Sequence, residues 1–223
     1  EPKYTFATAR ILLDSLRTEA LSFLKVKDNA TFAEMKSLYG TSLKAFVDKA
    51  VSLELLNPEL QKMDLDFLGN QIKPERDLLF SYLGLQTLYD RYFIHSNEIR
   101  FELPQVFFMR VAMGLAIAED NREERAVEFY NLLSSFDYMS STPTLFNAGT
   151  PHSQLSSCYL TTVPDDLYGI YGALQDNAML SKWAGGLGND WTPVRGMGAH
   201  IKGTNGKSQG CLLYTSPSPR DDL

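Results

Sequence analysis

The residue best suited to covalent chemistry is Cys158, which follows Ser156 and Ser157 and opens a run rich in strand-forming residues. A thiolate can act as a nucleophile or as half of a reversible redox pair, and either role needs a base or a second thiol nearby. The other cysteine of the chain is Cys211. Because unpaired cysteines are also often small, buried core residues, the residue type alone leaves a structural role open.

A second group of residues points to an anionic ligand. In a chain with a formal charge of −6, residues 182–207 hold an excess of basic over acidic side chains, with Asp190 opposed by Lys182, Arg195, Lys202 and Lys207. Glycines on both sides of Arg195 allow backbone amides to join the same anion, and a triphosphate would suit this arrangement. Two solvated surface charges at positions 195 and 202 are the alternative.

The glycine-rich segment from Gly185 to Gly188 could bring backbone amides close to a nucleotide. It lacks the lysine and Ser/Thr of a P-loop and does not complete a GxGxxG pattern. A glycine-rich turn after a helix explains it equally well. The histidines, His95, His152 and His200, are scattered without metal-ligand spacing, so we expect no metal site.

Apolar residues at spacings of three and four predict that residues 1–136 are helical. One predicted helix begins near Pro104, a residue that suits the first helical turn. Another follows Asp120 or Asn121, either of which can cap it. We expect the apolar stripes of these helices to form a common core.

The pattern changes near residue 137 and predicts the start of an α/β domain. Residues 140–144 are expected to be extended or to form a turn, because the residue before a proline avoids the helical region. Strands are expected over residues 158–163 and 191–194, and strand–helix–strand order favours an α/β fold. The intervening helix starts at Asp165–Asp166, with an apolar face made of Leu167, Ile170, Tyr171, Leu174 and Leu180.

Length and composition exclude several classes of protein. The 223 residues are 44% apolar and 22% charged, unlike a disordered or collagen-like chain. No apolar run reaches the ~18 residues that a membrane span needs, and no secretory signal is visible at the N-terminus. Two cysteines are too few for a disulfide scaffold and favour a reducing cytosol. The negative charge argues against a general nucleic-acid binder.

Taken together, these stretches resemble the large (alpha, catalytic) subunit of class I ribonucleoside-diphosphate reductase. The resemblance covers nearly all of residues 1–210 and is carried by these motifs: Asp90-Arg91-Tyr92-Phe93, Leu103-Pro104-Gln105, Ser140 to Thr150, Ser153 to Cys158, Asp165-Asp166-Leu167, Ala184 to Gly188, Val194 to Gly198 and Ile201 to Gly206. It implies a fragment that lacks both ends of the subunit.

The resemblance also implies a domain organisation. Residues 1–136 would form the N-terminal helical domain, and residues 137–210 the first strands and helix of the ten-stranded α/β barrel of ribonucleotide reductase. Residues 211–223 do not match the family, and we interpret them as a non-native tail. Cys211 is therefore not expected to be a redox partner.

The activity implied by the resemblance is reduction of ribonucleoside diphosphates to 2′-deoxyribonucleoside diphosphates by a thiyl-radical mechanism, for DNA synthesis. Cys158 would be one member of the redox-active dithiol. Thr142, Ser157, Gly185 and Gly186 would bind the substrate. Because the radical-forming cysteine and the second reducing cysteine have no match here, we expect the fragment itself to be inactive.

An allosteric site for a deoxynucleoside triphosphate or ATP is implied as well. The positions that match it are Asp165, Asp166 and Leu167 at the base and sugar, Arg195 and Lys202 at the phosphates, and Lys182 from a neighbouring subunit. We expect the charge of Arg195 to serve the triphosphate and not a surface salt bridge.

The resemblance further implies a set of partners and a location. The large subunit would form a homodimer through the helix over residues 166–183. It would work with a small, radical-generating subunit that holds a dimetal cofactor, and with thioredoxin or glutaredoxin. No covalently bound cofactor, nucleic acid or membrane is expected, and the location would be cytoplasmic. A helical interaction module joined to a non-catalytic nucleotide-sensing domain is the alternative.

Overall fold

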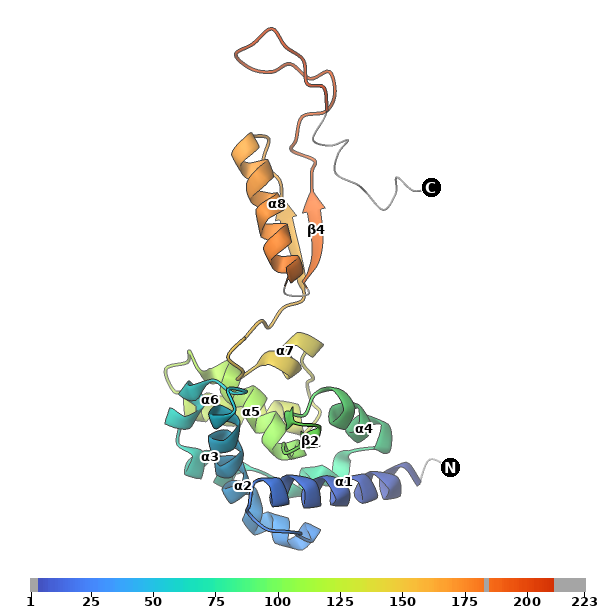
Figure 1. The fold of residues 1–223 in the computed structure, drawn as a ribbon, viewed down its shortest axis with the longest axis vertical. Coiled ribbons are helices and arrows are strands. Elements are labelled where there is room, and N and C mark those ends of the chain that lie inside the picture. Colours follow the sequence, from blue (N-terminus) through green and yellow to red (C-terminus); the bar gives the residue numbers. More distant parts are fainter. Residues whose placement is uncertain (1–3, 183–184, 211–223) are drawn as a thin grey trace. The chain divides into compact units, whose positions relative to one another are not determined.

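A computed structural model describes residues 4–182 and 185–210, and it divides the chain into two compact units. The first unit ends at Leu155 and the second begins at Ser156. Figure 1 draws both units, and each is described here by itself.

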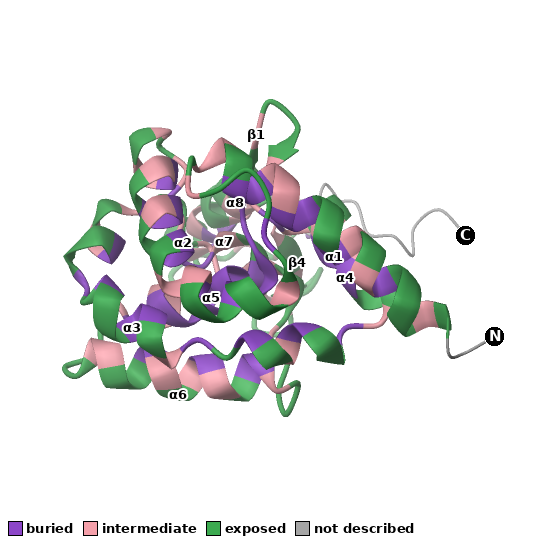
Figure 2. Cartoon of the chain, turned by 90° about the horizontal axis from the view of Figure 1, so that it is seen from below, coloured by how far each residue is buried: buried purple, intermediate pink, exposed green. Residues whose placement is uncertain are grey.

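The first unit is helical, as the apolar spacing predicts. Its helices and 3-10 turns are α1 (Tyr4–Phe23), α2 (Phe32–Ser52), η1 (Pro58–Lys62), α3 (Leu65–Gln71), η2 (Pro74–Leu79), α4 (Tyr82–Arg91), α5 (Pro104–Ala116), α6 (Arg122–Ser134) and α7 (Thr142–Asn147). One short antiparallel hairpin joins α4 to α5 and consists of β1 (His95–Ser96) and β2 (Ile99–Arg100). In Figure 2 these helices show purple, buried residues on their inner sides and green, exposed residues outside.

Helix α5 lies at the centre of the first unit. Every residue from Pro104 to Met113 is buried, so this helix has no solvent face in its first ten positions. A helix that is apolar almost all round belongs in a core. Its position explains why a charged residue within it, Arg110, must find partners inside the protein.

Helix α7 corrects the expectation that residues 140–144 are extended or form a turn. Ser141 is extended, with ψ at 159°, but the helix starts at Thr142 and carries Pro143 in its first turn. A proline there costs no hydrogen bond, because the first amides of a helix have no partner within it.

The first unit also extends beyond the change of sequence pattern at residue 137. Arg110 of α5 binds the backbone carbonyls of Leu145 and Ala148, which keeps this segment on the helical unit. A Cβ atom on Gly114 would lie 2.1 Å from the backbone nitrogen of Gly149, so only glycine permits this close approach. Tertiary contacts therefore move the division of the chain to residue 155.

The second unit is a β–α–β unit made of β3 (Cys158–Thr162), α8 (Leu167–Lys182) and β4 (Gly186–Asp190). The strands are parallel, with Cys158 opposite Gly186 and Thr162 opposite Asp190. This confirms the predicted order of strand, helix and strand, since parallel neighbours need a crossover connection. Figure 1 shows α8 lying along the two strands.

Two details of the second unit differ from the sequence-based expectations. The second strand lies in the glycine-rich segment and not over residues 191–194, which turn. The carboxylate of Asp190 accepts a hydrogen bond from the amide of Thr192 at 2.9 Å, and Pro193 has no amide to extend a ladder. In α8, Ile170 is buried, but three residues of the expected apolar face are exposed: Leu167, Tyr171 and Leu174.

No helix among the residues that the structure describes is long and apolar enough to cross a membrane.

Candidate functional site

The exposed thiol of Cys158 stands at the start of β3. Its Sγ lies 3.8 Å from the hydroxyl oxygen of Ser157. The thiol is therefore not buried within the second unit. The strand pairing brings together three residues predicted from the sequence, Ser157, Cys158 and Gly186, at one end of the parallel strand pair.

A glycine, Gly186, lies opposite the thiol. A Cβ atom on Gly186 would lie 3.2 Å from the carbonyl oxygen of Ser157 and 3.9 Å from Sγ of Cys158. The amide of Gly186 donates to that same carbonyl of Ser157 at 2.6 Å, and the amide of Gly185 donates to Leu180 at 2.9 Å. The two glycines thus bond to the last turn of α8 and to Ser157, and Gly186 places no side chain beside the thiol.

Four of the six residues expected at the effector site line one cavity of about 410 Å³ in the second unit. Its walls include Asp165, Asp166, Leu167 and Arg195, together with Ile170, Val194, Ile201, Ser208, Gln209 and Gly210. The cavity is large enough for part of a nucleotide. Helix α8 begins at this cavity, and the Asp166 carboxylate caps its first turn by accepting from the amide of Gly169 at 2.8 Å.

Arg195 is held by Asp165 within this cavity. Its Nε donates to both carboxylate oxygens of Asp165, at 3.0 and 2.8 Å, and its Nη2 donates to the Asp165 carbonyl at 3.3 Å. The backbone amide of Arg195 also donates to the carboxylate at 3.1 Å. The two side chains are 33% and 34% exposed. Arg195 therefore forms an ion pair with Asp165, which the sequence did not predict, and the service of its charge to a triphosphate stays a prediction.

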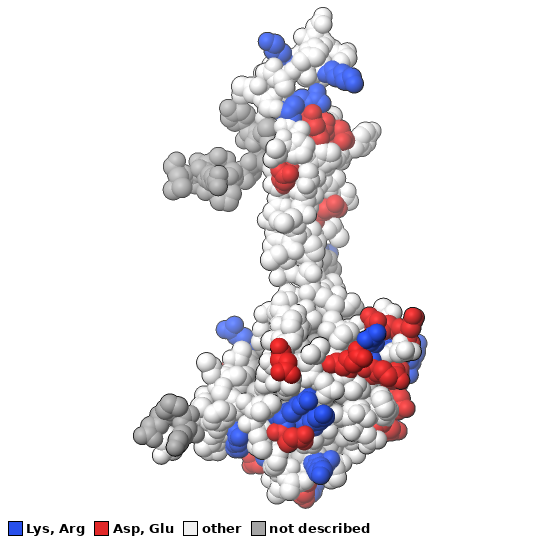
Figure 3. All heavy atoms as spheres, turned by 180° about the vertical axis from the view of Figure 1, so that it is seen from behind, with Lys and Arg blue, Asp and Glu red and all other residues white. Residues whose placement is uncertain are grey.

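The two lysines of the expected effector site lie apart from the cavity lining. Lys202 is exposed in the turn that follows Ile201. Lys182 is the last residue of α8, at the opposite end of the helix from Asp166. On the face drawn in Figure 3, basic and acidic side chains of the second unit lie next to one another, as the Arg195–Asp165 pair requires.

Thr142 belongs to the first unit, unlike the other residues expected to bind substrate. It is exposed at the start of α7, and its hydroxyl oxygen lies 3.0 Å from the phenolic oxygen of Tyr92. Because the two units are described separately, the grouping of Thr142 with Cys158 stays a prediction.

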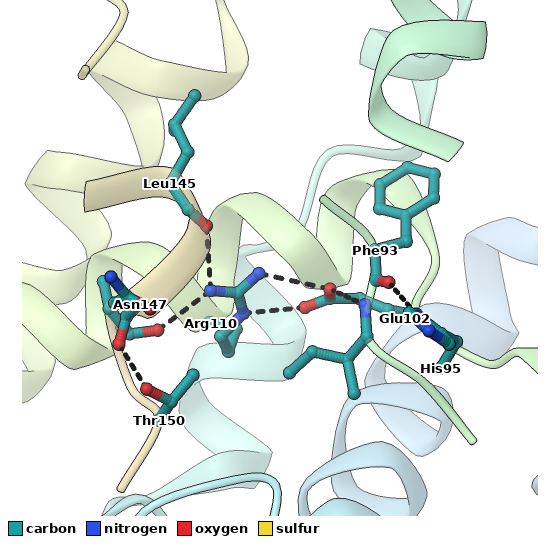
Figure 4. A network of polar contacts seen from close by, with 9 residues as sticks. Phe93, His95, Glu102, Arg110, Leu145, Asn147 and Thr150 are labelled. Carbon is teal, nitrogen blue, oxygen red and sulfur yellow. Dashed lines mark hydrogen bonds and ion pairs between the residues drawn. The ribbon is translucent and has the colours of Figure 1, made fainter. Parts of the chain in front are cut away.

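A buried ion pair behind α7 is a feature that sequence reasoning missed. Arg110 and Glu102 are fully buried and pair through Nε and Oε1 at 2.9 Å. Arg110 Nη1 donates to the carbonyls of Leu145 and Ala148, at 3.0 and 2.9 Å (Figure 4). An arginine inside an otherwise apolar helical run was the available signal, since such a charge needs partners.

Residues 4–182 and 185–210 contain no cluster of three His, Cys, Asp or Glu side chains that could hold a metal ion. Cys211 lies outside the described residues.

Family comparisons match both units. Residues 78–153 match the all-alpha domain of ribonucleotide reductase, and residues 156–216 match its barrel domain. The two matches fall on either side of the division after Leu155.

Relatives with curated names give the same result. The ribonucleoside-diphosphate reductase subunit alpha of Chlamydia muridarum is 54% identical over 215 residues, which cover 96% of this chain and 20% of that protein. The subunit alpha of Helicobacter pylori is 40% identical, covering 96% and 26%. The large chain 2 of Saccharomyces cerevisiae is 40% identical over 163 residues, covering 73% and 18%. The chain thus spans about a fifth to a quarter of the length of these relatives.

Proposed function

Because this chain belongs to the family of class I ribonucleotide reductase large subunits, we propose that it forms part of an enzyme that reduces ribonucleoside diphosphates to 2′-deoxyribonucleoside diphosphates. The observation that carries the proposal is the exposed Cys158 thiol beside Ser157 and Gly186. Such a reductase supplies deoxynucleotides for DNA synthesis.

The proposed chemistry consumes two thiols for each substrate. The 2′-hydroxyl of the ribose leaves as water and hydrogen takes its place, while two thiols lose two protons and two electrons to form one disulfide. Cys158 is one of those thiols. A thiyl radical on a further cysteine starts the reaction by removing a ribose hydrogen, and the radical cofactor of a small subunit supplies that oxidising equivalent.

The substrate is held by the residues around this thiol. Ser157 offers a hydroxyl next to Cys158, and the backbone of Gly185 and Gly186 contacts the substrate in this proposal. Thr142 offers a further hydroxyl from α7.

The cavity beside α8 binds the allosteric effector, a deoxynucleoside triphosphate or ATP. Asp165, Asp166 and Leu167 contact its base and sugar, and Arg195 and Lys202 bind its phosphates. Lys182 reaches the effector of a neighbouring subunit. The Nη1 atom of Arg195 is not part of the pair with Asp165, so it can face a phosphate while Asp165 orients the guanidinium.

Helix α8 supports a homodimer of large subunits, because several of its aromatic and aliphatic residues are exposed to solvent. Tyr168 is 93% exposed and Leu167 is 63% exposed. Exposed apolar residues gathered on one element are typical of an interface. The small subunit and a thioredoxin or glutaredoxin complete the proposed assembly, which is cytoplasmic.

The test uses a full-length large subunit that contains this chain, supplied with a small subunit and a dithiol reductant. We expect Cys158→Ser to abolish formation of deoxynucleoside diphosphate while leaving dTTP binding intact, because the thiol and the effector cavity involve different residues. Wild-type product formation by Cys158→Ser would overturn the proposal.

The 223-residue chain by itself is inactive in this proposal. A thiyl radical and a dithiol require three cysteines, and the chain has two. Deoxynucleotide formed by the isolated chain above a no-enzyme control would contradict it.

A further inference from the structure

The hydroxyl of Thr142 is paired with the phenol of Tyr92. The two oxygens lie 3.0 Å apart, and Tyr92 is the C-cap residue that follows α4. The Tyr92 ring meets the edge of Phe107 with 6.4 Å between ring centroids, so packing against α5 fixes the position of the phenol. A contact between residues fifty positions apart thus joins the end of α4 to the start of α7.

Hydrogen bonds to its backbone carbonyls hold the far end of the segment that follows Thr142. Arg110 donates to the carbonyls of Leu145 and Ala148. The carbonyl of Gly149, a residue with φ at +78°, accepts from the amide of Asn57 at 2.9 Å. The backbone of the segment is anchored in this way, and the Thr142 hydroxyl lies within hydrogen-bond distance of Tyr92.

We propose that Tyr92 is a positioning residue, whose O–H donates to the Thr142 oxygen and so directs the Thr142 O–H towards an oxygen of the substrate. This inference rests on the proposed role of Thr142 in substrate binding. The direction follows from hydrogen counting. A threonine hydroxyl has one hydrogen to donate. A diphosphate offers acceptors only, so Thr142 must donate to it and accept from Tyr92.

The arrangement also strengthens the contact with the substrate. In a chain of hydrogen bonds each donor polarises the next one, so an accepted bond from Tyr92 makes the Thr142 hydroxyl a better donor. Removing the phenolic oxygen leaves the Thr142 hydroxyl free to rotate among its staggered positions. The Thr142 hydroxyl is then neither oriented towards the substrate nor polarised by an accepted hydrogen bond, so it binds the substrate less tightly.

The test compares Tyr92→Phe with wild type in a full-length large subunit that contains this chain. Loss of one such hydrogen bond should raise the Kd and KM of a ribonucleoside diphosphate about 2- to 12-fold. The value of kcat and the melting temperature should change little, because the ring and its packing on Phe107 are retained.

Tyr89→Phe is the matched control. Tyr89 lies on the same helix, and its hydroxyl donates to Glu19 at 3.1 Å, away from Thr142. This variant removes a comparable hydroxyl and should leave the substrate Kd unchanged. An equal rise in Kd for Tyr89→Phe would show that the effect of Tyr92→Phe is structural and would overturn the inference.

A double-mutant cycle with Thr142→Val separates this inference from the proposed function. Thr142→Val should raise the substrate Kd, and Tyr92→Phe should add nothing in that background, because the two side chains act in series. Additive effects would overturn the positioning role of Tyr92. An unchanged Kd for Thr142→Val would instead refute the proposed role of Thr142 itself, and Tyr92 would then have nothing to position.

Discussion

Arg195 and Asp165, thirty residues apart in sequence, form a hydrogen-bonded ion pair in the structure. Three donors of Arg195, its backbone amide, Nε and Nη2, all bind Asp165. The carboxylate orients the guanidinium and offsets part of its charge. An anion that binds to Arg195 therefore meets a guanidinium whose direction is already set, which lowers the entropic cost of binding.

Arg195→Ala is expected to weaken dTTP binding about 10- to 150-fold in a full-length large subunit, because a charged hydrogen bond to phosphate is worth about 1.5–3 kcal/mol. Stimulation of GDP reduction by dTTP should need correspondingly more effector. Lys207→Ala is the control, since Lys207 belongs to the same basic stretch but does not line the cavity. Unchanged dTTP affinity in a dimeric Arg195→Ala protein would refute the effector role of Arg195 and weaken that of Lys202.

A second group of hydrogen-bonded polar side chains lies in the core of the helical unit, around Asp77. Its two carboxylate oxygens accept from the Tyr39 hydroxyl at 2.6 Å and from the Gln105 amide at 2.9 Å. Burial raises the pKa of Asp77 from 3.8 to about 6, although these two hydrogen bonds and the charge of Arg17 lower it. Desolvation therefore outweighs the hydrogen bonds.

The raised pKa predicts that acid stabilises this part of the fold. Between pH 4 and pH 6 the native carboxyl holds its proton while the unfolded one has lost it. The free energy of unfolding should therefore fall as the pH rises, by about 3 kcal/mol in total, and level off above pH 6. Urea unfolding of this chain at several pH values measures the slope.

Two substitutions test whether Asp77 causes this change of the unfolding free energy with pH. Asp77→Asn should flatten the slope, whatever its effect on stability at a single pH. Glu34→Gln should leave the slope between pH 5 and pH 7 unchanged, because hydrogen bonds from Lys27 and Thr31 lower the pKa of Glu34 to about 2. A slope that persists in Asp77→Asn would show that another group is responsible.

The buried pair of Arg110 and Glu102 should be far more sensitive to substitution than a surface pair. Arg110→Met leaves the Glu102 charge and the carbonyls of Leu145 and Ala148 without this donor, and should lower the free energy of unfolding by about 3–5 kcal/mol. Urea unfolding of this chain provides the measurement.

Arg125→Met is the matched control for this prediction. The Arg125–Glu128 pair is just as close, at 2.6 Å, but its side chains are 51% and 58% exposed, so its loss should cost less than about 1 kcal/mol. Similar losses in Arg110→Met and Arg125→Met would show that burial does not set the energy of the Arg110 pair.

The sequence by itself determined the type and order of most elements, because apolar spacing and start signals act locally. The helix beginning at Pro104, the strand beginning at Cys158 and the helix after Asp166 all occur where these patterns predict them. Each depends on residues within a few turns of one another. The family resemblance rested in the same way on contiguous motifs, and both family domains match it.

Tertiary structure decided the features that depend on contacts between residues far apart in sequence. The second strand formed at Gly186 because β3 offers a parallel partner there, a preference that the glycine-rich sequence does not reveal. The exposure of Cys158, the pairing of Arg195 with Asp165 and the burial of Arg110 depend on elements that are distant in sequence. Charge and residue type indicate that a partner is needed, but only the folded chain selects that partner, because selection depends on which groups become close and desolvated together.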